Sequence, residues 1–208
     1  TDTSQHIPPR WVDTGPVKQN ILKGNDVNLE MFPTPHWNER DGGRLLGSFG
    51  AVFTKDRDSD WVNIGIYRLM MHSKDELGIQ LDPANQHIGE HYFKKIEDNE
   101  PMEVAVAIGH EPALSFMACI PTVDPVSELD IAGAIRGQPI DVVKAETVDL
   151  PVPANAEIVI EGTIHPKERK MEGPLGEYPG YYGGVAGPKP VLRVRCITHR
   201  DDPIFRGT

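Results

Sequence analysis

The sequence predicts an α+β protein in which an antiparallel β-sheet curls into a barrel flanked by a few helices. Seven short apolar runs have the length and the bounding residues of strands, whereas only two segments have the pattern of helices. The 20 glycines and 19 prolines make up about a fifth of the 208 residues, below the fraction typical of disordered chains. These observations favour a loop-rich folded domain over a helical bundle.

Residues 1–44 are predicted to be an arm or lead-in segment, and residues 45–208 the main domain. The first segment is polar and is interrupted by prolines at positions 8, 9, 16, 33 and 35, with no sustained hydrophobic period. From Leu45 onward, short apolar runs predict strands. These runs are Leu46–Phe53, Trp61–Met71, Val104–Ile108, Leu114–Ile120, Ile140–Val148, Glu157–Ile164 and Val191–Thr198.

Two segments predict helices, Asp82–Glu97 and Ser127–Arg136. Asp82 is a suitable N-cap and Pro83 suits the first helical position. Ser127 is a suitable N-cap for the second helix, and Gly137 is a natural stop. The first segment also carries an apolar stripe at Ile88, Tyr92 and Ile96.

The charge and hydropathy pattern excludes two classes of partner. Asp and Glu number 31 against 21 Lys and Arg, so the formal net charge is −10. Binding to nucleic acid by counterion release needs clustered positive charge, which this balance argues against. No run approaches the roughly 20 apolar residues of a membrane span. We therefore expect neither a nucleic-acid partner nor a membrane.

The two cysteines, Cys119 and Cys196, are too few for a disulfide scaffold, and both have apolar neighbours in the sequence. We interpret both as buried free thiols. The first residues have no charged-then-apolar leader, so we expect a cytoplasmic protein. The chain begins with Thr1 and ends just after a strand-like run, which suggests a piece of a longer protein.

The run Trp61-Val-Asn-Ile-Gly-Ile-Tyr-Arg68 contains an amide and a guanidinium five positions apart. On a regular strand, Asn63 and Arg68 point to opposite faces. A β-bulge at Gly65 would redirect one of them to the same side. The alternative is an asparagine at a strand entrance and an arginine on a solvent-facing surface.

His87 and His91 lie in an H-x-x-E-H pattern, which places them one helical turn apart. This spacing matches the inverted zinc-peptidase signature and makes a zinc hydrolase a rival hypothesis. That chemistry also needs a downstream acidic ligand on another helix. The strand-rich remainder offers no clear residue for that position.

Carboxylates at two further places are candidates for chemistry. Glu128 lies in the first turn of a predicted helix, where unpaired backbone N–H groups alone account for it. In the run at residues 171–184, Glu172 and Glu177 are separated by Gly173, Pro174 and Gly176, so the backbone can bring them together. Converging carboxylates raise each other's proton affinity, which suits a general acid. The alternative is a surface loop with solvated glutamates.

Taken in order, these segments resemble the UbiD family of decarboxylases, which use prenylated FMN. The resemblance covers roughly residues 45–205 and depends on the order of several blocks. These are Val62–Arg68, Gln86-His87, Ser127-Glu128 followed by Ile131-Ala-Gly, Pro153–Gly162, Glu172–Glu177, Gly180–Tyr182 and Thr198–Ile204.

The resemblance implies that Asn63, His87 and Glu128 hold a divalent ion, Mn²⁺ or Mg²⁺, at the phosphate of the cofactor. An amide oxygen, an imidazole and a carboxylate suit such an ion. It also implies a K⁺ ion held largely by backbone carbonyls around Ala118–Ile120. The further cofactor contacts that it implies are Ile64, Ile66, Tyr67, Arg68, Gln86, Ala118, Cys119 and Ile120.

The family's catalytic residues correspond to Arg68, Glu172 and Glu177. The guanidinium pairs with the substrate carboxylate, Glu177 delivers the proton after CO₂ leaves, and Glu172 holds Arg68. The resemblance implies a split β-barrel related to flavin reductases. Full family members are longer, with an N-terminal α/β portion and a C-terminal portion used in oligomer contacts, so we expect a homo-oligomer at full length.

The leading hypothesis is a reversible, non-oxidative decarboxylase for aromatic or α,β-unsaturated carboxylic acids, with hydroxybenzoate-like substrates favoured. Its partners are then a small carboxylic acid and a flavin prenyltransferase that supplies the cofactor. Two alternatives stay open. One is the zinc hydrolase built on His87 and His91, and the other is a non-catalytic flavin-barrel or assembly module.

Overall fold

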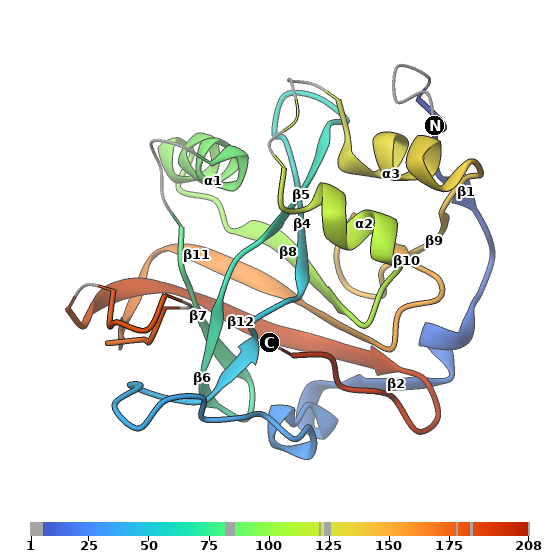
Figure 1. Cartoon of the computed structure of the whole chain (residues 1–208). Coiled ribbons are helices and arrows are strands. Elements are labelled where there is room, and N and C mark those ends of the chain that lie inside the picture. The colour runs from blue at the N-terminus through green and yellow to red at the C-terminus, as the bar shows by residue number, and fades with distance from the viewer. Residues whose placement is uncertain are drawn as a thin grey trace.

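The computed structural model describes residues 6–81, 86–120, 122, 126–177, 179–183 and 185–207 (Figure 1). Strands dominate this part of the chain. They are β1 (Arg10–Trp11), β2 (Asn20–Lys23), β3 (Leu45–Gly47), β4 (Ala51–Lys55), β5 (Val62–Ile66), β6 (Leu69–Ser73), β7 (Glu76–Ile79), β8 (Met102–Ile108), β9 (Asp141–Lys144), β10 (Pro151–Pro153), β11 (Ile158–Glu172) and β12 (Gly187–His199). The α-helices are α1 (His87–Glu97), α2 (Pro112–Met117) and α3 (Glu128–Arg136).

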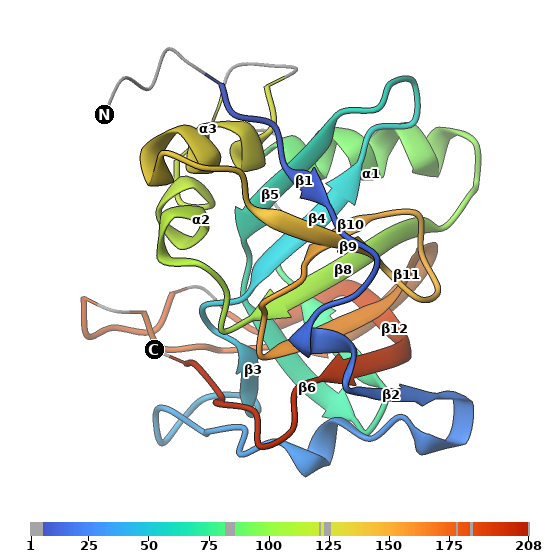
Figure 2. The same cartoon turned by 90° about the vertical axis from the view of Figure 1, so that its right-hand side faces the viewer.

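Within the described ranges, the strands form a large and a small sheet. The large sheet has nine strands in the order β3-β6-β7-β12-β11-β8-β4-β5, and β2 pairs with β12 beside that path. Its pairs are antiparallel, and the sheet curls around an apolar interior, as the two views show (Figure 1, Figure 2). The predicted α+β class with a curled antiparallel sheet is confirmed.

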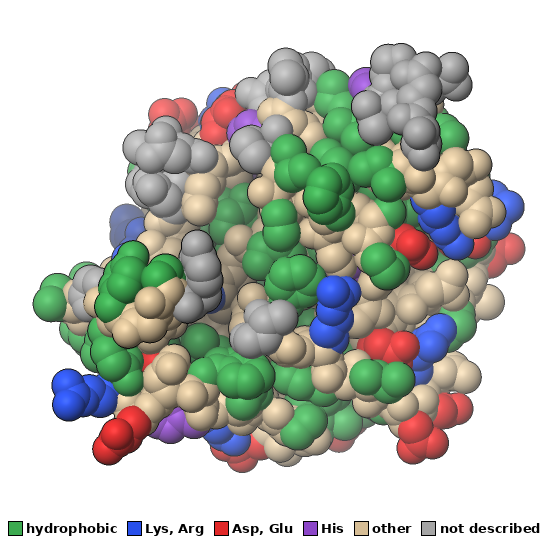
Figure 3. Space-filling view, viewed as in Figure 1, with side chains coloured by type: hydrophobic (Ala, Val, Ile, Leu, Met, Phe, Trp, Pro, Cys, Tyr) green, Lys and Arg blue, Asp and Glu red, His purple; other side chains and the backbone are tan. Residues whose placement is uncertain are grey.

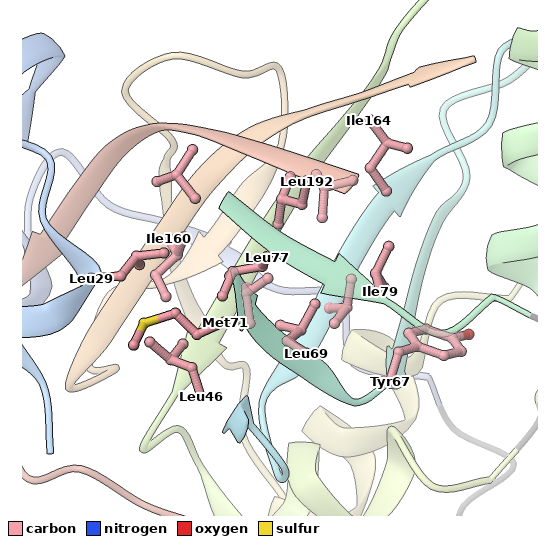
Figure 4. Packing of buried hydrophobic residues seen from close by; sticks show 14 of the residues in the cluster. Leu29, Leu46, Tyr67, Leu69, Met71, Leu77, Ile79, Ile160, Ile164 and Leu192 are labelled. Carbon is pink, nitrogen blue, oxygen red and sulfur yellow. The ribbon is translucent and has the colours of Figure 1, made fainter. Parts of the chain in front are cut away.

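The interior of the curled sheet is filled by side chains from alternate positions of its strands. Figure 4 shows them pointing toward one another from β3, β6, β7, β11 and β12. Removing this apolar surface from water is the main stabilising contribution to the fold. The residues labelled there and buried below 10% exposure are Leu29, Leu46, Tyr67, Leu69, Met71, Leu77, Ile79, Ile160, Ile164 and Leu192.

A second apolar cluster lies on the outer side of the large sheet. It joins residues of β4, β5 and β8 to α2, α3 and the small sheet of β1, β9 and β10. In Figure 2, the two helices and the small sheet lie together on one side of the large sheet. This packing fixes the ends of α2 and α3 against β5, which matters for the site below.

The run Leu114–Ile120 is a helix and not the predicted strand. Pro112 occupies the first turn of α2, where its missing N–H costs nothing. Leu114, Met117 and Ala118 have helical spacing and are buried against the second cluster. A short apolar run does not distinguish a buried helix from a strand by periodicity alone, and Pro112 is compatible with the helix start.

The predicted strand Trp61–Met71 is two strands, β5 and β6, with Tyr67 and Arg68 between them. The pairing of β5 with β4 has an unbroken register, so the predicted bulge at Gly65 is wrong. Arg68 lies past the end of β5. The alternation of side chains along that strand therefore does not determine where it points.

Both predicted helices are present, and the second has the predicted caps. The Ser127 side chain accepts a hydrogen bond from the Leu129 N–H, and Gly137 ends α3 with φ of 76°. α1 begins at His87. The predicted roles of Asp82 and Pro83 lie outside the described residues.

Part of the predicted lead-in segment packs on the barrel. β2 pairs with β12, and Val27, Leu29 and Phe32 belong to the interior cluster. None of the described helices has the length and apolar character needed to cross a bilayer.

Candidate functional site

Two neighbouring cavities collect almost all the polar side chains that the sequence singles out. The first, here called the β5 cavity, has a volume of about 380 Å³. The second, here called the arginine cavity, also measures about 380 Å³. Consecutive residues join them, because Tyr67 lines the β5 cavity and Arg68 lines the arginine cavity.

The β5 cavity is formed where three helix ends meet one strand. Its walls come from β5, from the start of α1, from the residues after α2 and from the start of α3. The Ile66 N–H donates to the Ala118 carbonyl at 3.1 Å, which ties the strand to the end of α2. The residues that line it are Asn63, Ile64, Gly65, Ile66, Tyr67, Gln86, His87, Ala118, Cys119, Ile120 and Glu128.

Glu128 is a buried carboxylate on the wall of this cavity, with 1% of its surface exposed. One oxygen accepts from the Ile64 N–H at 2.8 Å, and the other accepts from the Thr122 hydroxyl at 2.9 Å. Burial raises the pKa of Glu128, and the hydrogen bonds that its carboxylate accepts from backbone N–H groups and from Thr122 oppose that rise. Its position at the start of α3 therefore does more than cap the helix.

Asn63 and His87 face the same space. Asn63 is 2% exposed, and its Nδ2 atom has no hydrogen-bond partner among the described residues. A buried amide without a partner costs free energy, so a polar ligand in the cavity would relieve that cost. Together with Glu128, the three side chains offer an amide, an imidazole and a carboxylate. This donor set fits a hard or borderline divalent cation.

His91 does not line the β5 cavity, although both histidine rings pack edge-on against Trp61. Its Nδ1 atom lies 3.0 Å from the Thr54 hydroxyl, and its ring packs edge-on against Trp61 at 4.7 Å. Burial lowers the pKa of His91 to about 4. Across the residues that the structure describes, no cluster of three His, Cys, Asp or Glu side chains could hold a metal. The zinc-hydrolase hypothesis therefore lacks a ligand set in this part of the chain.

Arg68, Glu172 and Glu177 meet in the arginine cavity. The Arg68 Nη1 atom donates to the Glu177 Oε1 atom at 2.8 Å, and the Arg68 Nε atom lies 3.5 Å from the Glu172 Oε1 atom. Leu175, Gln80 and Lys189 also line this cavity. The two glutamates, five positions apart in the sequence, are thus brought to one guanidinium.

The two glutamates have different surroundings. Glu172 ends β11 and is 2% exposed, and neither carboxylate oxygen has a hydrogen-bond partner in the described part of the chain. Burial raises the pKa of Glu172, whereas Arg68 and Lys189 lower it. The Glu177 side chain is 38% exposed and pairs with Arg68. Burial therefore favours the protonated form of Glu172.

The backbone turns sharply on both sides of Glu177. Gly173 has φ of 88° and Gly180 has φ of 92°, a region that favours glycine. The Glu177 N–H donates to the Tyr181 carbonyl at 2.8 Å, and the Gly183 N–H donates to the Leu175 carbonyl at 3.2 Å. We call residues 172–183 the glutamate loop.

The environment of Cys119 differs from the prediction. It lies just after α2, where it is exposed, and not inside an apolar strand. The prediction was wrong because it assigned a strand to this segment. Cys196 is a buried free thiol as predicted, and burial raises its pKa to about 12.

The sequence analysis missed Gln80 and Lys189 in the arginine cavity. Gln80 follows β7, and Lys189 lies within β12. Polar residues at such positions usually face solvent, so their type and spacing carry no signal. Only the packing of β7 and β12 beside the glutamate loop brings them to the site.

A family model and several relatives match this chain. Residues 10–208 match the model described as "UbiD: 3-octaprenyl-4-hydroxybenzoate carboxy-lyase Rift-related domain". The pyrrole-2-carboxylic acid decarboxylase of Pseudomonas aeruginosa is 37% identical over 204 residues, which is 97% of this chain and 40% of that protein. The phenolic acid decarboxylase of Bacillus subtilis is 37% identical over 96% of this chain and 42% of its own length.

Solved structures give the same result. The UbiD-class enzyme HmfF from Pelotomaculum thermopropionicum, in an evolved dimeric form with prFMN, superposes with a TM-score of 0.91 at 40% identity. This match covers 97% of this chain and 47% of that one. The closed form of vanillic acid decarboxylase from Sedimentibacter hydroxybenzoicus has a TM-score of 0.91 at 38% identity, covering 97% and 43% of the two chains. The chain thus spans less than half the length of these relatives.

Proposed function

The chain belongs to the UbiD family, and on that premise we propose that it is the cofactor-binding part of a decarboxylase. The substrates are aromatic or α,β-unsaturated carboxylic acids, with hydroxybenzoate-like acids favoured, and the cofactor is prenylated FMN. The observation that carries the proposal is the meeting of Arg68, Glu172 and Glu177 beside the β5 cavity. Relatives named as decarboxylases of pyrrole-2-carboxylic and phenolic acids support the substrate class.

Arg68 would bind the substrate carboxylate. A guanidinium presents two parallel N–H groups that match the two oxygens of a carboxylate, which orients the C–C bond to be broken. Glu172 and Glu177 hold Arg68 from two sides, at 3.5 and 2.8 Å. Because the guanidinium is anchored in this way, the substrate would arrive in one orientation.

A proton must reach the carbon that loses CO₂. Glu177 is the proposed donor, because it is partly exposed, lies on the loop and contacts Arg68. Glu172 is buried and lies 3.5 Å from the Arg68 Nε atom, so its proposed role is to hold Arg68 and to tune Glu177. When bound, prenylated FMN supplies an electron sink for the bond that breaks. The same arrangement run backward is a carboxylation at high CO₂.

Asn63, His87 and Glu128 would hold the divalent cation, Mn²⁺ or Mg²⁺, that anchors the cofactor phosphate. Their donor set and their shared position on the wall of the β5 cavity support this assignment. Carbonyls around Ala118–Ile120 are the proposed K⁺ ligands. The remaining residues of the β5 cavity are the proposed cofactor contacts.

Two partners complete the proposal. A flavin prenyltransferase supplies the modified flavin, and a second copy of the full-length chain forms a homo-oligomer. In support of the second, hydrophobic side chains gather on one face over α2 and over the loop between β11 and β12 (Figure 3). Phe116 is 60% exposed there, and Val185 is 93% exposed. Exposed apolar surface of this kind is typical of protein interfaces.

The test is the Glu177→Gln variant of the intact enzyme loaded with prenylated FMN. Glutamine keeps the size of the side chain and removes its proton, so CO₂ release is expected to fall by about 10²–10⁴-fold. The absorbance of the bound flavin is expected to stay the same. Glu97→Gln, at the exposed end of α1, is the matched control and is expected to retain activity.

Undiminished CO₂ release in the Glu177→Gln variant would refute the proton-donor role. A parent enzyme that assembles into oligomers but binds no flavin would favour the non-catalytic module instead. Absorbance of the isolated protein in the near-ultraviolet and visible range distinguishes these outcomes at once.

A further inference from the structure

A segment outside the predicted barrel domain makes close contact with the glutamate loop. Residues 34–44, here called the lead segment, precede β3, and in Figure 1 they lie below the loop between β11 and β12. Asp41 is the buried residue at the centre of this contact, with 7% of its surface exposed. An aspartate buried to this extent needs partners for its charge.

The partners of the Asp41 carboxylate are N–H groups. Its Oδ1 atom accepts from the Gly176 backbone N–H at 2.7 Å. Its Oδ2 atom accepts from the Asn38 backbone N–H at 2.9 Å and from the Asn38 side chain at 3.2 Å. In the described ranges no Lys or Arg forms an ion pair with it. Hydrogen bonds to an ionised acceptor are roughly twice as strong as neutral ones, so the bond to Gly176 is a firm attachment.

Two further hydrogen bonds join the segments on either side of Asp41. The Gly42 N–H donates to the Pro174 carbonyl at 2.8 Å, and the Arg40 N–H donates to the Tyr182 hydroxyl at 2.9 Å. The lead segment therefore contacts the glutamate loop at positions 174, 176 and 182. These positions lie on both sides of Glu177.

The two backbones approach so closely at Gly42 that glycine is required there, and Gly176 lies directly against the Asn38 side chain. A Cβ atom on Gly42 would lie 2.3 Å from the Gly173 carbonyl oxygen, and one on Gly176 would lie 2.3 Å from the Asn38 side-chain amide. Leu175 adds an apolar contact, because it is buried with Leu45 and Met70. The contact between the lead segment and the glutamate loop is therefore closely packed and consists of more than a surface hydrogen bond.

We propose that Asp41 is a positioning residue, which holds the glutamate loop so that Glu177 meets Arg68. Gly176 precedes Glu177 directly, and the hydrogen bond from its N–H to Asp41 fixes the backbone from which that side chain extends. The other printed contacts of Glu177 lie within the loop itself or at Arg68: its backbone bonds to Tyr181 and Gly180, and its side chain pairs with Arg68. This inference depends on the proposed function, in which Glu177 delivers the proton.

The test compares Asp41→Asn and Asp41→Ala with Glu39→Gln in the intact enzyme with prenylated FMN. Asparagine retains one acceptor but cannot accept at both positions, whereas alanine removes both. Glu39 is exposed in the same turn and makes no ion pair or hydrogen bond in the described chain, so it is the control for charge. Small misplacements of a reacting group can cost about 10²-fold. We therefore expect kcat to fall about 10- to 100-fold with alanine and less with asparagine, at nearly unchanged KM.

The second measurement is hydrogen exchange at the Gly176 amide, made on the protein without cofactor. Faster exchange there in both Asp41 variants, with normal flavin absorbance and thermal midpoint in Asp41→Asn, would support the positioning role. Unchanged exchange at Gly176, or unchanged kcat despite faster exchange, would overturn it. A general loss of stability in Asp41→Asn that accounts for the lost activity would also overturn it.

The exchange measurement also separates this inference from the proposed function. If the parent enzyme releases no CO₂ from any acid tested, the proposed function fails and the positioning role fails with it. The attachment of Asp41 to Gly176 would still be visible in the exchange data. If the parent is active and only the Asp41 result is negative, the proposed function stands and this inference alone is refuted.

Discussion

Replacing Glu172 by glutamine is expected to make the folded protein more stable and the enzyme less active. The side chain is 2% exposed, and both of its oxygens lack hydrogen-bond partners in the described chain. Keeping a carboxylate charge buried without hydrogen bonds costs about 1–3 kcal/mol or more, and the Arg68 guanidinium at 3.5 Å offsets only part of that cost. Glutamine removes the charge but keeps the shape. We therefore expect a net gain of about 1 kcal/mol in the free energy of unfolding.

The gain should depend on pH in a defined direction. Burial raises the pKa of Glu172, so the folded state binds this proton more tightly than the unfolded state does. The stability that comes from this proton is complete below about pH 4, the ordinary range of a glutamate, and is lost as pH rises through the folded-state pKa. Glutamine has no proton to lose. Variant and parent are therefore expected to be similar in acid and to diverge as the pH rises.

Urea unfolding at several pH values measures this difference, and CO₂ release measures the loss of activity. For a chain of 208 residues, about 1 kcal/mol corresponds to a rise in Tm of about 2–4 °C. A variant that is less stable than the parent by the same amount at every pH would refute the reasoning, because the ion pair with Arg68 would then outweigh the cost of burial. Full retention of activity would show that Glu172 does not hold Arg68 for the reaction.

Two further predictions concern the metal site and the core. His87→Ala is expected to weaken Mn²⁺ binding by at least about tenfold, measured by electron paramagnetic resonance. His165 lies outside the β5 cavity, so His165→Ala is the control and is expected to leave Mn²⁺ binding unchanged. Equal loss of binding in both variants would contradict the assignment. Leu77→Ala removes a fully buried side chain from the barrel interior and is expected to lower the free energy of unfolding by about 2–5 kcal/mol in urea. A loss below about 1 kcal/mol would mean that the interior collapses around the gap.

Local signals in the sequence were sufficient to predict the ends of a helix with clear capping residues. Ser127 and Gly137 bound α3 as expected, because capping depends on a few neighbouring residues. The run Leu114–Ile120 was misassigned, since its burial against the second cluster is a tertiary property. The same error placed Cys119 inside a strand, although it lies exposed after α2.

Some residues of the candidate site were also predictable from the sequence, and others were not. The side chains of Asn63, His87 and Glu128 were selected as a set by resemblance, and the structure brings them to one cavity. The bulge predicted at Gly65 is not needed to explain the direction of Arg68, because Arg68 lies beyond the end of β5. Asp41 was not detectable, since an aspartate in a polar, proline-rich segment is typical of a surface turn. Its burial depends on a loop more than a hundred residues later in the chain.

The glutamate loop leaves the barrel from β11 and returns to it through β12, two long strands that pair with each other and with β2, β7 and β8. Because both of its ends are held in these strands, the glutamate loop can change its sequence without disturbing the pairing of β11 with β12. Exchanging the apolar residues of this excursion between relatives, while keeping Glu172, Gly176 and Glu177, is therefore a rational way to alter which acids the cavity accepts. Swaps that remove Gly176 would bring a new side chain against Asn38, whose side chain would then have to move from its place beside Asp41.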